Sequence, residues 1–220
     1  MFNYESLIKK FDKSNMFEMI SGFSIQIHDS IQFMENWSTK KSYSNIENVL
    51  ITGMGGSAIG GDFVSALLVK DCQVPVFVNR SYEIPGWVNE KTLVIASSYS
   101  GNTEETISAY KIALSRKSKI ICVTTGGKLE ESAIKSNLDI VVIPPGLQPR
   151  AALGYSLAIN LFLLAKTGLI LYDQIKPRLL IALEELENWQ DQFQIKEDEN
   201  PAMPIAFKIK NTFPVIYAGT

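Results

Sequence analysis

The chain reads VLITGMGGS at residues 49–57, a short apolar run that stops at a glycine-rich turn. Residues 58–69 follow with apolar side chains at helical spacing, and the same alternation of apolar run and helix then repeats. We predict five strands, at residues 49–51, 74–78, 93–96, 119–124 and 139–143. Continuous apolar strands separated by helices indicate a parallel sheet covered on both faces, so we expect a doubly wound α/β fold.

Helical patterns flank this α/β region on both sides. Apolar side chains recur at steps of three and four before residue 40, and helical spacing returns at 150–170, 174–193 and 201–210. The segment FPVIYAGT at 213–220 is an apolar run entering a glycine turn, and it repeats the pattern of residues 49–53. We divide the chain into a helical lead (1–47), an α/β domain (48–165), a helical linker (166–211) and the first strand of an incomplete second domain (212–220).

The composition excludes several classes of protein. The 220 residues are 46% hydrophobic and 20% charged, as in ordinary globular domains. A net charge of −2 gives no reason to expect a nucleic-acid or acidic-membrane partner. Cys72 and Cys122 form neither a disulfide framework nor a zinc spacing. No signal peptide and no apolar run of bilayer length is visible, so we expect a cytoplasmic protein.

The glycine loop (residues 53–57) is the first candidate ligand site. Gly53, Gly55 and Gly56 permit positive φ and a close approach of the backbone to a ligand, and Ser57 adds a hydroxyl. The helix that follows would direct free N–H groups and its positive dipole end at this loop, which suits an anion or a sugar hydroxyl. The alternative is that these glycines serve only tight packing of strand against helix.

The hydroxyl loop (residues 97–103) follows the third strand, in the string SSYSGNTEET at 97–106. Any one of Ser98, Ser100 and Thr103 could simply cap the next helix, but three hydroxyls with free amides and Gly101 form a cup for a phosphate dianion. The loop has no Lys or Arg and no P-loop ending. We therefore expect a small phosphoester, held by hydrogen bonds and the helix dipole.

Arg150 stands in the string GLQPRA at 146–151, where it begins an otherwise apolar helix. A cation is disfavoured at a helix N-terminus, so we expect it to face a substrate oxyanion or a carboxylate, unless it is an ordinary surface arginine. His28, the single histidine, falls in an N-terminal helix, and we expect no catalytic role for it. We expect no metal, since no His, Cys and Asp cluster is visible.

Taken together, the glycine loop and the string at 98–106 resemble a sugar isomerase (SIS) domain, which has a flavodoxin-like fold. The string at 146–151 and the helices after it resemble more closely the bifunctional phosphoglucose/phosphomannose isomerases. The resemblance extends from about residue 48 to residue 220. The hydroxyl string is a specific signal, whereas the glycine loop alone is not.

The resemblance implies roles for these residues and an activity. The phosphate would be bound by Ser98, Ser100 and Thr103, and the sugar would be contacted by Gly55, Gly56 and Ser57. Arg150 would be catalytic and would stabilise the negative charge of an enediolate intermediate. The family converts glucose 6-phosphate or mannose 6-phosphate to fructose 6-phosphate, in glycolysis and gluconeogenesis. It needs no metal or organic cofactor and is dimeric, so we expect a homodimer.

The sequence departs from the family at the catalytic base. The family's base is a glutamate, and this residue, a ring-opening histidine and a lysine all follow the strand that residues 215–217 would match. None of them lies within the 220 residues, and Glu184, Glu185 and Glu187 occupy the wrong segment to replace the base. We expect a truncated chain that binds sugar phosphate and turns over little or nothing.

Other functions fit parts of the sequence. A regulatory SIS module would sense a sugar phosphate without chemistry, and an aminosugar-forming SIS enzyme shares fewer of these strings. An NADP-dependent Rossmann oxidoreductase would use Gly53, Gly55 and Ala58 as a loose fingerprint, with Arg80 placed for a 2′-phosphate. Asn79 and Arg80 occupy the strand end where NAD would require an acid, and this alternative leaves the hydroxyl loop unexplained.

Overall fold

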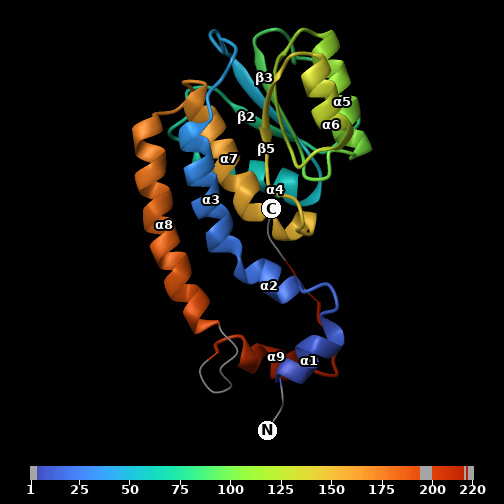
Figure 1. Ribbon diagram of the computed structural model, residues 1–220, viewed down its shortest axis with the longest axis vertical. Helices are drawn as coiled ribbons and strands as arrows, with labels where there is room; N and C mark the ends of the chain where they lie inside the picture. The colour runs from blue at the N-terminus through green and yellow to red at the C-terminus, as the bar shows by residue number, and fades with distance from the viewer. Residues whose placement is uncertain (1–3, 194–199, 216, 218–220) are drawn as a thin grey trace.

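The computed structural model describes residues 4–193, 200–215 and 217 (Figure 1). Its sheet has five strands in the order β2-β1-β3-β4-β5, and every neighbouring pair is parallel. The strands are β1 (Asn48–Thr52), β2 (Val76–Asn79), β3 (Thr92–Ser98), β4 (Lys119–Thr124) and β5 (Asp139–Val142). The doubly wound five-stranded fold is therefore confirmed. This strand order is the flavodoxin type and not the dinucleotide-binding type, which disfavours the oxidoreductase alternative.

Helices cover both faces of the sheet. The helices are α1 (Tyr4–Phe11), α2 (Met16–Ser21), α3 (Phe23–Asn36), α4 (Gly55–Leu67), α5 (Glu104–Ser115), α6 (Gly127–Lys135), α7 (Leu153–Lys166), α8 (Tyr172–Gln192) and α9 (Met203–Ile209), with a 3-10 turn η1 (Pro149–Ala151). Figure 1 shows α5 and α6 on one side of the sheet and α3, α7 and α8 on the other. In the part of the chain described here, no helix combines the length and apolar character that a membrane span requires.

The register of the strands explains why there are two hydrophobic cores. Leu50 pairs with Val94, and Val94 pairs with Ile120, so these side chains form a row on the face covered by α5 and α6. The next residues along, Ile51 and Ile95, belong to the opposite core. Because successive side chains of a strand point to opposite faces, apolar residues at every position bury both faces.

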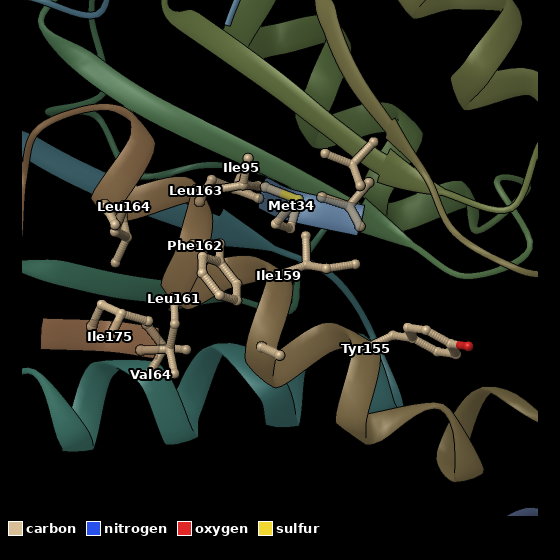
Figure 2. Close-up of a cluster of buried hydrophobic side chains, with 14 of the residues drawn as sticks. Met34, Val64, Ile95, Tyr155, Ile159, Leu161, Phe162, Leu163, Leu164 and Ile175 are labelled. Carbon is tan, nitrogen blue, oxygen red and sulfur yellow. The ribbon is translucent and has the colours of Figure 1, made fainter. Parts of the chain in front are cut away.

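Helix α7 lies at the centre of the larger core and packs against both α3 and α4. Phe162 is fully buried, and Figure 2 shows it beside Ile159 and Leu161 of the same helix. In that view Met34 of α3 and Ile95 of β3 lie together near this helix. The helix is apolar around nearly its whole circumference because it is enclosed by other elements, as expected for a buried helix.

Two predictions for the C-terminal part need comment. The helix predicted at 150–170 is wrong at its start, since Arg150 lies in η1 and α7 begins at Leu153. Pro149 opens that short turn, and helix α7 follows as a separate element. Residues 213–215 and 217 pair with no strand, and 216 and 218–220 lie outside the described residues. The assignment of 212–220 to a second domain therefore stays a prediction.

Candidate functional site

The site lies where the sheet changes its direction of winding. Strands β1 and β3 are neighbours, yet the helix after β1 (α4) covers one face and the helix after β3 (α5) covers the other. In such sheets a crevice opens at the carboxyl ends of these two strands, and ligands bind there. The glycine loop and the hydroxyl loop follow these two strands, so both lie at this end of the sheet.

Gly53 brings the two loops into direct contact. A Cβ at this position would lie only 2.8 Å from the backbone oxygen of Ser97, closer than real side chains allow. The Gly53 N–H also donates to the Asn79 carbonyl at 3.1 Å, which extends the sheet by one residue. A side chain here would push the glycine loop away from the end of β3.

Gly55 and Gly56 open α4 for different physical reasons. Gly55 has φ +51°, in the left-handed region, and its surroundings are open. A Cβ on Gly56 would overlap the Pro149 carbonyl oxygen and lie 3.2 Å from the Arg150 Cα. Gly56 therefore allows α4 to meet η1 directly. Gly56 thus has a packing role at its contact with η1, whereas exposed Gly55 leaves its backbone open to a ligand.

The hydroxyl loop is built around a contact between two side chains. The Ser98 hydroxyl is buried and donates to Thr103 Oγ1 at 2.9 Å. Ser100 is exposed, and its Oγ accepts a long hydrogen bond of 3.3 Å from the Asn102 N–H. Thr103 occupies the N-cap position of α5 but makes no side-chain capping bond. Because neither bond caps α5, simple helix capping does not account for these hydroxyls.

Tyr99 anchors the hydroxyl loop to the segment that leads to Arg150. Its hydroxyl donates to the Pro144 carbonyl at 2.9 Å and accepts the Leu147 N–H at 2.9 Å. Burial raises the pKa of this phenol, while the bond from Leu147 opposes that shift. The phenol therefore stays protonated and keeps both bonds. On its other side the loop contacts the first turn of α6, where the Leu129 N–H donates to the Gly101 carbonyl at 3.0 Å.

Arg150 is exposed on η1, next to the first turn of α4. Within the described ranges of the chain, its guanidinium has no hydrogen-bond or ion-pair partner. The carboxylates nearest to the hydroxyl loop in sequence, Glu104 and Glu105, lie close to Tyr82 and raise the pKa of that phenol, Glu105 the more strongly. Among the residues that the structure describes, no carboxylate pairs with Arg150, so its charge is open to an anionic ligand.

The remaining sequence candidates lie apart from the crevice. His28 is exposed on α3, and Glu184, Glu185 and Glu187 are exposed on α8. Sequence reasoning missed one residue that contacts the site. Gln26 of α3 is buried, and its amide bonds the backbone immediately after Arg150. Its only signal was a polar residue between apolar positions of a helix, which is too common to be specific.

The chain is similar to known proteins over most of its length. Residues 42–145 match the SIS domain family. This chain contains a SIS domain. Over 204 residues (92% of the chain) it is 45% identical to the bifunctional phosphoglucose/phosphomannose isomerase of Caldicellulosiruptor bescii. Over 146 residues (66% of the chain) it is 38% identical to the enzyme of the same name from Thermoplasma volcanium. The predicted resemblance is therefore confirmed.

A solved structure agrees at the level of fold. The C-terminal domain of glucosamine-fructose-6-phosphate aminotransferase from Francisella tularensis superimposes with a TM-score of 0.58 at 16% identity, over 88% of this chain and 57% of that one. The chain spans 60% of the Caldicellulosiruptor relative and 44% of the Thermoplasma relative. The SIS match ends before Arg150, so the arginine and helices α3 and α7 lie outside the matched domain, whereas α4 lies inside it.

Proposed function

We propose that this chain forms the phosphate-binding half of a sugar-phosphate isomerase. The proposed reaction converts glucose 6-phosphate or mannose 6-phosphate to fructose 6-phosphate through an enediolate. The observation that carries the proposal is the meeting of three segments at the carboxyl ends of β1 and β3. The glycine loop contacts the end of β3 through Gly53, and it contacts the Arg150 turn through Gly56.

The hydroxyl loop would hold the phosphate. Since Ser98 donates its proton to Thr103 Oγ1, the Thr103 proton remains free to be donated to a phosphate oxygen. The exposed Ser100 hydroxyl and the uncapped N–H groups of α5 would add further donors. Gly55, Gly56 and Ser57 would contact the sugar from the other loop. Ser98 acts in this arrangement mainly by orienting Thr103.

Arg150 would serve the chemical step. Isomerisation of the open-chain aldose removes a proton from C2, places negative charge on the enediolate oxygens, and returns a proton to C1. A guanidinium beside those oxygens stabilises the charge that develops in the transition state. The phosphate, bound several atoms away, supplies binding energy that positions the reacting carbons. We assign the base that moves the proton to no residue of this chain, so we expect binding with little turnover.

A thermal titration tests this function. Fructose 6-phosphate should raise the melting temperature of the chain, and the double variant Ser100→Ala, Thr103→Ala should lose that stabilisation. Ser115→Ala, at the far end of α5, is the matched control and should keep it. Stabilisation by NADPH in place of the sugar phosphate would contradict the proposal. A coupled isomerase assay run alongside would reveal an unassigned base if turnover were substantial.

The proposal extends to the organisation of the protein. Phe213 is 91% exposed and Tyr217 is 93% exposed, which supports residues 212–220 as the first strand of a second SIS domain. We propose a cytoplasmic homodimer. An apolar groove of about 650 Å³ between α4 and α8, lined by Phe63, Leu67 and Trp189 among others, supports association. Multi-angle light scattering on the purified chain would overturn the dimer by giving one chain's mass.

A further inference from the structure

The Arg150 turn (η1) is held by an N-terminal helix that lies outside the SIS match. Gln26 of α3 is 3% exposed, and both ends of its amide are used. Its Nε2 donates to the Ala151 carbonyl at 2.7 Å, and its Oε1 accepts the Gly154 N–H at 3.0 Å. These bonds join segments 125 and 128 residues apart in the chain.

The two backbone groups that Gln26 bonds have no strong alternative partner. Gly154 lies in the first turn of α7, where N–H groups have no intrahelical acceptor, and Ala152 at the N-cap offers no side-chain cap. Gln26 therefore caps α7 from another helix. It also holds the carbonyl of the residue directly after Arg150. Losing either bond would leave a buried polar group unpaired or force the turn to move.

Packing on both sides makes this arrangement specific. A Cβ on Gly154 would lie 2.8 Å from Gln26 Cβ, so the absence of a side chain there lets α3 approach the start of α7. On the opposite side, the Ser156 hydroxyl donates to the Gly56 carbonyl at 3.1 Å, tying α7 to the first turn of α4. The turn bearing Arg150 is thus held between α3 and α4.

We propose that Gln26 is a positioning residue that sets where Arg150 presents its charge to the ligand. The inference rests on the proposed function, because it assigns Arg150 to an anionic centre beside the sugar. Gln26 itself touches no substrate. It acts through the backbone of Ala151 and Gly154. Its loss should weaken binding of the negative charge near C1 and C2 of the ligand and leave phosphate binding unchanged.

Two ligands of equal length separate these effects. 5-Phosphoarabinonate carries a carboxylate in place of the enediolate oxygens, whereas arabinitol 5-phosphate carries a neutral hydroxyl there. Calorimetric titration gives the ratio of their affinities, in which the contribution of the shared phosphate cancels. The wild-type chain should prefer the arabinonate, and Arg150→Ala should abolish the preference. Gln26→Leu should reduce the ratio about tenfold, as expected for a displaced charge-assisted hydrogen bond.

Matched variants separate positioning from general destabilisation. Ser30→Ala removes a buried hydrogen bond of the same helix, from Ser30 Oγ to the Gln26 carbonyl, and should leave the ratio unchanged. In the Arg150→Ala background, Gln26→Leu should change the ratio no further. If Gln26→Leu folds poorly, Gln26→Glu serves instead. Its carboxyl can donate to Ala151 only when protonated, so the ratio should recover as the pH falls.

The outcomes distinguish the inference from the proposed function. A wild-type chain that binds neither ligand would refute the proposed function, and the inference would fail with it. Equal affinity of the wild-type chain for the two ligands would show that Arg150 does not contact the ligand's charge, and this result would overturn the inference. A preference that survives in Gln26→Leu, or that Ser30→Ala lowers equally, would overturn the inference alone.

Discussion

Replacing Gly56 with alanine tests how closely α4 and the Arg150 turn meet. The added Cβ would overlap the Pro149 carbonyl oxygen and lie 3.1 Å from its carbon. Both partners are backbone, so neither can rotate away as a flexible side chain would, and the two elements must separate. Overpacking of this kind costs about 1–3 kcal/mol. At about 2–4 °C per kcal/mol for a chain of this size, the melting temperature should fall by about 2–12 °C.

Two other glycines supply the controls. Gly86→Ala places a Cβ in open space at an ordinary φ, and should change stability by less than about 0.5 kcal/mol. Gly55→Ala also meets open space, but φ +51° costs roughly 1 kcal/mol, most of which Gly55→Asn should recover. Calorimetry of the four variants is the assay. If Gly56→Ala had the same melting temperature as Gly86→Ala, the close contact between α4 and the Arg150 turn would be refuted.

Three further perturbations follow from packing, hydrogen bonding and burial. Phe162→Ala should lower the free energy of unfolding by about 3–5 kcal/mol in urea titrations, since the ring is fully buried; a loss below 1 kcal/mol would contradict the core described. Tyr99→Phe removes two bonds to residues 144–147 and should cost about 1–3 kcal/mol, measured the same way. Burial raises the pKa of the Cys122 thiol to about 12. The neutral thiol therefore contributes fully to the free energy of unfolding below pH 9, and this contribution is lost as the pH rises toward 12. Cys122→Ala should flatten that alkaline loss, and at pH 8 iodoacetamide should label partly exposed Cys72 first.

The local sequence pattern was sufficient to predict the strands of the fold and most of its helices. Continuous apolar runs of strand length, each followed by helical spacing, predicted five parallel strands, and all five are present. The glycine and hydroxyl strings were also recognisable, because turn glycines and clustered hydroxyls stand out against apolar strands. Since the carboxyl ends of parallel strands share one edge, the sequence could place both loops at that edge.

Contacts between distant segments depended on the tertiary structure. No local pattern places Arg150 in a separate turn against Gly56, and the sequence predicted a continuous helix there. Gln26 has no distinguishing spacing, yet it caps a helix 128 residues away. These contacts arise from how α3, α4 and α7 pack against one another, and the spacing between helices is set by the small residues that happen to meet. The sequence therefore determined the loops, and the packing of these three helices decided how the arginine meets them.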